Sequence, residues 1–406
     1  MTLPTAARAV VVIVWLVTLP VAAFADVLAD KLEPHVGQVI DLIELGTGTR
    51  YVRPRLEGLV VRDGEVKSLR IVPEGEAQPK TLLLSGVTRI DANRETVHTA
   101  EVKRGGAAAF KLARAKEAYA KEQAAAVDRM QQRGIAPWPR LAATDHDAEL
   151  KELREFARQV SQAFPTLETA ETHEFIVVTD IPAAQIKPYV ANLDGMHDFL
   201  CTLYGIPPGE PVWKGKCLVF AFFKEDDFQV FEDRFMQSTL RGMHGLCHQR
   251  SDGRVIMACH RGDDAPAFAH MLVHETSHGF NYRWLSPTHL PNWLNEGIAE
   301  WVGTKLVSGC NQVPLKEARA LEYMKQKGNL GTGFFDADNI ASVQYGMASG
   351  LVKFLAGRDL KKFAAFVRAL KEGVPVEESL KQTYGASLDE LVKSYGTAIG
   401  VPTLTR

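Results

Sequence analysis

The sequence lacks an excess of charge of either sign and is poor in cysteine. Beyond residue 25 it has no apolar run long enough to cross a bilayer. Its 406 residues carry 47 Lys and Arg against 49 Asp and Glu, a formal net charge of −2. This balance provides no basic field, so no nucleic-acid partner is expected. Five cysteines exclude a disulfide-held miniprotein, and 46% hydrophobic residues exclude a disordered chain.

The first 25 residues have the pattern of an export signal. Arg8 is their only charged side chain, and residues 9–19 are almost wholly apolar. Small residues at Ala23 and Ala25 are typical of a signal-peptidase site. We therefore predict a signal peptide over residues 1–25, cleaved after Ala25, and a periplasmic or extracellular protein without a membrane span. An uncleaved signal anchor is the alternative.

Composition divides the rest of the chain into three parts. Residues 26–105 contain short apolar runs broken by Gly, Pro and Asp, which predicts a small β-rich domain. Its expected role is to bind an unknown partner or to act as an inert cover. Residues 106–165 are rich in Ala, Lys, Glu and Gln, which predicts a helical linker. Residues 166–406 alternate strands with helices before a mostly helical end, so the expected fold class is α+β.

The odd number of cysteines leaves at least one thiol unpaired. Cys247 and Cys259 flank a predicted hairpin with Asp252-Gly253 at its tip. They face each other if the loop takes three residues, whereas a two-residue turn places Cys247 opposite Ala258. A disulfide and a pair of small buried residues both remain open. Pairing among all five is equally undetermined: Cys201, Cys217, Cys247, Cys259 and Cys310.

Residues 274–278 read His-Glu-Thr-Ser-His. Pro266 suits a first helical turn, so we expect this segment on a helix that begins near residue 265. Residues four apart share one helix face, so His274 and His278 can bind one ion. Glu275 projects beside them, where it can polarise a metal-bound water.

A third ligand is available 18 positions after His278. Glu296 and Glu300 lie four apart on a second predicted helix that begins at Pro291. Glu296 would complete a set of two His and one Glu and leave a fourth position for water. Glu300 could accept the free N–H of a ligand histidine. A solvated helix face is the alternative for both carboxylates.

Together these motifs resemble the gluzincin zinc metallopeptidases. His274-Glu275-x-x-His278 is followed by Trp-Leu-Asn-Glu-Gly-Ile-Ala-Glu over residues 293–300. The pair is most similar to the peptidase-MA-like branch of exported bacterial proteins, over roughly residues 173–400. The resemblance implies a thermolysin-like catalytic domain, in which a mixed sheet precedes a helical part.

The resemblance also implies a tyrosine that steadies the oxyanion. Tyr345 leads a segment with apolar residues six, seven, nine and ten positions later, similar to the Tyr-led helix of aminopeptidase-type gluzincins. The Lys-Gly that usually follows that tyrosine is absent here. A core tyrosine is the alternative, and Tyr282 and Tyr323 are weaker candidates.

A marker of aminopeptidases in this clan is missing. Their Gly-Ala-Met-Glu-Asn strand supplies a Glu for the substrate's amine, but residues 255–260 read Val-Ile-Met-Ala-Cys-His. We predict that this segment is an edge strand that pairs with an extended peptide through Val255, Met257 and Ala258.

Other histidines offer weaker ligand candidates. His270 lies one turn before His274 and would compete with Glu296. The Cys-His pairs at residues 247–248 and 259–260 could form a second metal site, but their separation does not match common zinc-finger spacings. Hairpin residues or a disulfide explain these pairs better.

The sequence therefore predicts a zinc-dependent peptidase. One zinc ion would bind His274, His278, Glu296 and a water, with Glu275 as general base and a peptide or protein as substrate. The alternative is a non-catalytic exported binding or scaffold protein with a structural or vestigial zinc site. Glu275 favours the enzyme, because zinc binding alone needs no base beside the ligands.

Overall fold

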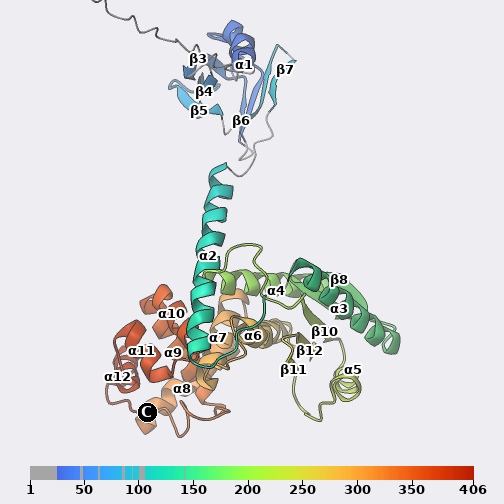
Figure 1. Cartoon of the computed structure of the whole chain (residues 1–406), viewed down its shortest axis with the longest axis vertical. Coiled ribbons are helices and arrows are strands. Elements are labelled where there is room, and N and C mark those ends of the chain that lie inside the picture. Colours follow the sequence, from blue (N-terminus) through green and yellow to red (C-terminus); the bar gives the residue numbers. More distant parts are fainter. Residues whose placement is uncertain are drawn as a thin grey trace, which may run out of the picture. The chain divides into compact units, whose positions relative to one another are not determined.

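A computed structural model describes residues 25–45, 49–62, 65–84, 87–93, 95–99, 106–140 and 142–406 (Figure 1). The predicted signal peptide lies outside these residues except for Ala25. The chain forms two compact units that divide between Ala113 and Arg114. We call them the N-terminal unit and the C-terminal unit. No helix among the described residues is long and apolar enough to span a membrane.

The N-terminal unit is β-rich, as predicted. One antiparallel sheet has the order β2-β1-β6-β7, and a second has the order β3-β4-β5. Leu32, Ile43, Leu69 and Ile90 are fully buried in its core. Its elements are α1 (Ala25–Leu32), η2 (Glu33–His35), β1 (Leu42–Leu45), β2 (Arg50–Val52), β3 (Arg55–Arg62), β4 (Glu65–Val72), β5 (Lys80–Leu83), β6 (Val87–Ala92) and β7 (Glu95–Thr99).

The C-terminal unit contains the predicted mixed sheet, in the order β11-β12-β10-β9-β8. The three inner strands are parallel to one another, and the two outer strands are antiparallel to their neighbours. Every residue of the inner strands is buried, because helices or helical turns cover both faces. The strands are β8 (Glu168–Glu171), β9 (Phe175–Thr179), β10 (Cys217–Phe222), β11 (Gly245–Gln249) and β12 (Val255–His260).

Helices surround the sheet and then form the C-terminal part. One face packs against α3, α5 and the π-helical turn η4, and the other against α4 and α6. Helix α7 packs against both α6 and α9. The helices are α2 (Gly106–Gln132), α3 (Ala143–Ala163), α4 (Ala183–Tyr204), α5 (Glu225–Phe231), η4 (Glu232–Met236), α6 (Ala265–Arg283), α7 (Asn292–Leu306), α8 (Gln312–Lys327), α9 (Gln344–Arg358), α10 (Leu360–Lys371), α11 (Val376–Tyr384) and α12 (Leu388–Ala398).

The predicted linker over residues 106–165 is helical and forms the helices α2 and α3. Residues 114–165 belong to the C-terminal unit rather than to a separate connection. Met130 of α2 is 1% exposed, and Val160 of α3 is buried under the sheet. Arg129 adds two hydrogen bonds of 2.7 and 2.8 Å to the carboxylate of Glu372. Helix propensity predicts the helices but does not show what their sparse apolar residues pack against.

The hairpin β11–β12 has a different register from either predicted one. Cys247 lies opposite Met257, and Gly245 lies opposite Cys259. The loop takes residues 250–254 and is centred on Asp252, whereas a three-residue loop over residues 252–254 would be centred on Gly253. Cys247 and Cys259 are therefore not opposite each other, and all five cysteines are free thiols.

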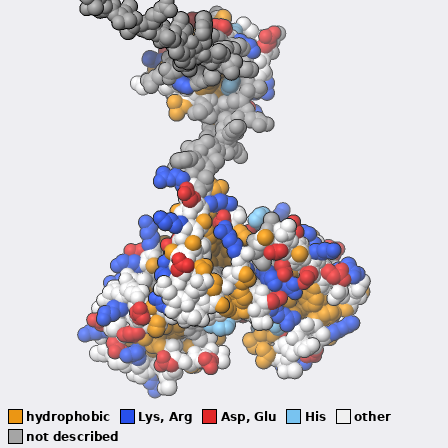
Figure 2. Space-filling model, viewed as in Figure 1, with side chains coloured by type: hydrophobic (Ala, Val, Ile, Leu, Met, Phe, Trp, Pro, Cys, Tyr) orange, Lys and Arg blue, Asp and Glu red, His pale blue; other side chains and the backbone are white. Residues whose placement is uncertain are grey.

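Charges are mixed on the visible surface of the C-terminal unit. Figure 2 shows Lys and Arg side chains interspersed with Asp and Glu side chains over this unit. The face in view therefore carries no large field of one sign.

Candidate metal centre

Two helices supply the predicted ligands. Asp264 begins α6, because its side chain accepts a hydrogen bond of 3.0 Å from the backbone N–H of Ala267. Helix α6 carries His274 and His278, and α7 carries Glu296. Gly297 of α7 faces α9, because an added Cβ would lie 2.5 Å from the carbonyl oxygen of Ala348.

Three ligand atoms converge on one point. His274 Nε2 lies 3.1 Å from Glu296 Oε2 and 3.1 Å from His278 Nε2. His278 Nε2 lies 3.5 Å from the same Glu296 oxygen. Ligand atoms placed about 2.0–2.1 Å from a tetrahedral metal stand about 3.3 Å apart, by the geometry of the tetrahedron. The two imidazoles and the carboxylate therefore fit a metal ion without rearrangement.

The charges at this point suit a cation. Burial would raise the pKa of Glu296, but hydrogen bonds from His274 and His278 outweigh it and hold that pKa well below its usual range. Burial would lower the pKa of His278, but the Glu296 carboxylate raises it to about 9. The carboxylate is thus strongly stabilised as an anion. A bound metal ion would take the place of the proton on His278.

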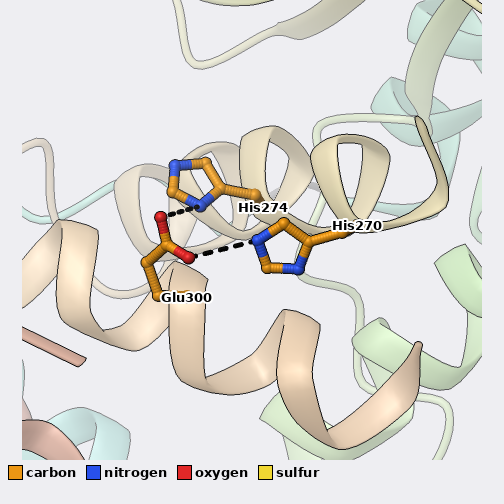
Figure 3. Close-up of side chains that lie close together, drawn as sticks. All are labelled: His270, His274 and Glu300. Atoms are coloured by element: carbon orange, nitrogen blue, oxygen red, sulfur yellow. Dashed lines mark hydrogen bonds and ion pairs between the residues drawn. The ribbon is translucent and has the colours of Figure 1, made fainter. Parts of the chain in front are cut away.

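Glu300 lies behind this group and is fully buried (Figure 3). Its Oε2 is 3.2 Å from His270 Nε2, and its Oε1 is 3.8 Å from His274 Nδ1. Lys316 Nζ lies 2.5 Å from the same Oε1. Burial would raise the pKa of Glu300, but His270, His274 and Lys316 lower it to about 2. The carboxylate therefore faces the ring nitrogen of His274 that points away from Glu296.

His270 belongs to the Glu300 side of the site. Its ring fits against α7 at Gly303, where an added Cβ would lie 2.2 Å from Nδ1. His270, His274 and Glu300 also place ligand atoms within 4.8 Å of one another, as do His274, Glu275 and His278. An ion in the first of these groups would face the ammonium of Lys316. The point shared by His274, His278 and Glu296 is therefore the better metal position.

A cavity of about 490 Å³ adjoins the metal position. His274, Glu275 and Tyr345 all line it. Burial raises the pKa of Tyr345 to about 12, and the carboxylates of Glu296, Glu275 and Glu300 add to this effect. The phenol therefore keeps its proton at neutral pH and can donate a hydrogen bond into the cavity.

The predicted peptide-binding strand is not at the edge of the sheet. β12 pairs with both β10 and β11, and Val255, Met257 and Ala258 are 2%, 0% and 0% exposed. The prediction was wrong because apolar alternation cannot tell an inner strand from its neighbour in a hairpin. In this hairpin the edge strand is β11, and its residues after Gly245 are partly exposed.

The other sequence candidates have separate partners. His248 is 3.0 Å from Glu232 Oε1, and the His244 and His260 rings lie 4.9 Å apart. No metal-binding group forms around the cysteine–histidine pairs of the described chain. Tyr282 donates to the carbonyl of Arg250, 3.0 Å away, and does not line the cavity.

Several cavity residues had no signal in the sequence. Arg261 comes from the loop after β12, and Lys316 comes from α8. His260 stood out only because it follows Cys259. Neither periodicity nor spacing connects these residues to the HExxH segment, so only the folded chain reveals them.

Comparison with protein-family models and with curated proteins gives no match to this chain. The geometry of the site and the motif resemblance are therefore the observations that bear on function.

Proposed function

We propose that the C-terminal unit is a zinc-dependent peptide hydrolase of the gluzincin type. The observation that carries this proposal is the convergence of His274 Nε2, His278 Nε2 and Glu296 Oε2 within 3.5 Å, beside a cavity lined by Glu275. Two imidazoles and one carboxylate with an open fourth position are typical of catalytic zinc. The mixed sheet and the packing of α6 against α7 support this proposal, which includes the thermolysin-like fold that the resemblance implies.

The residues divide the chemistry between them. When bound, zinc would polarise the scissile carbonyl and lower the pKa of a water molecule. Glu275 takes the proton of the attacking water and delivers it to the leaving amine. Tyr345 donates a hydrogen bond to the developing oxyanion, because its phenol stays protonated. Glu300 fixes the orientation of the His274 ring from behind.

The substrate in this proposal is an extended peptide. The edge strand β11 has one unpaired side and packs against α6, the helix that carries Glu275. A peptide added to this edge would continue the sheet next to the cavity. With the predicted signal peptide over residues 1–25, the activity would operate outside the cytoplasm. The N-terminal unit would bind a separate partner.

Glu275→Gln tests the proposal most directly. Wild-type protein loaded with zinc should cleave members of a peptide library, and a chelator should abolish cleavage. The variant should keep its zinc, measured by elemental analysis, and lose kcat/KM by a factor of at least about 1,000. Glu322→Gln, an exposed change on α8, is the matched control and should retain full activity. Full activity of Glu275→Gln, or no cleavage by zinc-loaded wild type, would contradict the proposal.

A further inference from the structure

The cavity beside Glu275 continues away from the metal position. His260, Arg261, Gly262 and Asp263 line it, and the same four residues line a second cavity of about 320 Å³. They follow or end β12, and Arg261 N donates to the carbonyl of Phe222 at the end of β10, 2.9 Å away. The cavities therefore meet at the carboxyl ends of parallel strands, where ligands of open α/β sheets commonly bind.

Arg261 has a partly buried guanidinium and makes no ion pair with a carboxylate among the described residues. Its Nε is buried and has no hydrogen-bond partner in the described part of the chain. Its Nη1 donates only to the carbonyl of Gly262, 3.2 Å away. By contrast, Arg129 and Arg154 each make two hydrogen bonds to a glutamate. A partly buried guanidinium without an anion is uncommon in a folded protein.

Phe223 holds the guanidinium in place. The Arg261 Cζ lies 5.6 Å from the centre of the Phe223 ring, and both residues line the second cavity. A guanidinium stacked on an aromatic face keeps its N–H groups free at the edge. With Nε buried, the terminal nitrogens Nη1 and Nη2 are the groups of Arg261 that can donate to a carboxylate.

The nearby acidic side chains do not neutralise Arg261. Asp264 uses its carboxylate to cap α6. Asp263, Glu225 and Asp226 are exposed to solvent, which screens their charges. No ion pair joins any of them to Arg261 among the residues that the structure describes. The partly buried cation therefore remains available for an anion from outside the chain.

We infer that Arg261 binds a carboxylate of the substrate, so that the enzyme prefers acidic peptides. This inference rests on the proposed peptide hydrolysis. The carboxylate can come from an Asp or Glu side chain or from a free C-terminus, because both offer the same pair of oxygens.

The length of α6 sets the position of this carboxylate. From Ala265, which follows the Arg261 loop, to Glu275 the helix rises by about 15 Å. An extended peptide covers about 3.3 Å per residue, so about four residues bridge this distance. Because the Arg261 side chain can extend toward the peptide, fewer residues are needed between the scissile bond and the acidic group. We therefore place the acidic group about three to four residues from the scissile bond.

A peptide series with one moving aspartate tests the inference. Each peptide carries Asp at a single position around the scissile bond, and each is made with a free and an amidated C-terminus. Wild-type enzyme should cleave the best acidic peptide about 10- to 100-fold faster, in kcat/KM, than the matching Asn peptide. A preference for free C-termini alone would identify the terminal carboxylate as the ligand.

Variants at residue 261 test whether Arg261 causes the preference for acidic peptides. Arg261→Ala should bring the Asp-to-Asn ratio close to one, and Arg261→Glu should favour Lys at the same position. Arg158→Ala removes an exposed arginine of α3 and should leave the ratio unchanged. Zinc content and thermal unfolding verify that each variant is folded. If Arg261→Ala unfolds, Arg261→Gln provides the same measurement with a similar volume.

The two proposals fail in different ways. If zinc-loaded protein cleaves no peptide, binding of the Asp and Asn peptides to Glu275→Gln still measures the contribution of Arg261. An Asp preference that persists in Arg261→Ala would overturn the inference, as would no Asp preference at any position in either assay.

Discussion

His274 Nε2 lies 3.1 Å from Glu296 Oε2, although the two residues are 22 positions apart in the sequence. The contact joins α6 to α7 at the point where His278 also arrives. Three side chains on two packed helices thus form one binding point. The loop of residues 284–291 connects the two helices and supplies none of the three ligands.

Glu296→Ala should remove the metal. The two histidines on α6 would remain, but two imidazoles without the carboxylate bind zinc much more weakly. Elemental analysis after gel filtration should find about one zinc per wild-type chain and little in the variant. Glu322→Ala on α8 is the control. Unchanged zinc content in Glu296→Ala would remove Glu296 from the ligand set.

Lys316→Met should weaken zinc binding without touching a ligand. The change removes the ammonium 2.5 Å from Glu300 Oε1, so the buried carboxylate loses a partner and holds His274 less firmly. Changes to such outer partners typically cost about 10- to 100-fold in metal affinity. Competition with a fluorescent chelator measures this, with Lys325→Met as the exposed control. Equal affinities would show that Lys316 does not support the site.

Tyr345→Phe should lower kcat and leave zinc in place. The phenol hydrogen bond would act on the oxyanion, and loss of one such donor typically costs about 10²- to 10³-fold. Steady-state kinetics on the best library peptide provides the test. Tyr323→Phe, which alters a tyrosine outside the cavity, should behave as wild type. If Tyr345→Phe keeps its kcat, the tyrosine is a packing residue.

Lys371 should make stability depend on pH. This lysine is fully buried, and its Nζ donates to the carbonyls of Thr288 and Tyr282 at 2.6 and 3.3 Å. Burial, aided by Arg283, lowers the pKa of Lys371 to about 7. In the unfolded chain, the pKa of a lysine is about 10.4. Between pH 7 and about 10.4 the unfolded chain therefore binds more protons than the folded chain, so the free energy of unfolding increases as pH rises.

Comparison with Lys371→Met isolates this effect, because other titrating groups are common to both proteins. The free energy of unfolding of wild type minus that of the variant should rise by a few kcal/mol from pH 6 to pH 10. Urea unfolding at several pH values measures the difference. A constant difference across this range would show that Lys371 keeps a normal pKa.

All five cysteines should react as thiols. The register of β11 with β12 separates Cys247 from Cys259, and neither is bonded. A thiol reagent added to purified, unreduced protein in denaturant should find five thiols per chain. Three thiols would mean that one pair is oxidised, and the hairpin register would differ if peptide mapping identified that pair as Cys247 and Cys259.

The sequence predicted much of the fold because local patterns dictate much of it. The β-rich N-terminal unit and the helices around His274 follow from alternation, helical spacing and capping, whereas the mixed sheet was implied by the family resemblance. The placement of His274 and His278 on one face of α6 also followed, because residues four apart on one helix share a face. Glu296 lies on a separate helix, and the need for a third metal ligand had suggested it.

The sequence could not predict how separate elements pair. The order of strands made β12 internal and β11 an edge strand, and a hairpin loop centred on Asp252 placed Cys247 opposite Met257 rather than Cys259. Both depend on contacts between segments, and local alternation is equally compatible with either choice.

The sequence alone thus determined the HExxH segment and the two glutamates on the following helix. It also determined that these residue types suit a zinc site. Tertiary structure decided which groups surround them. Lys316 and His270 meet at Glu300, and Arg261 reaches the cavity from the loop before α6. These residues lie on different elements, and only packing of those elements against a common core brings their charges together.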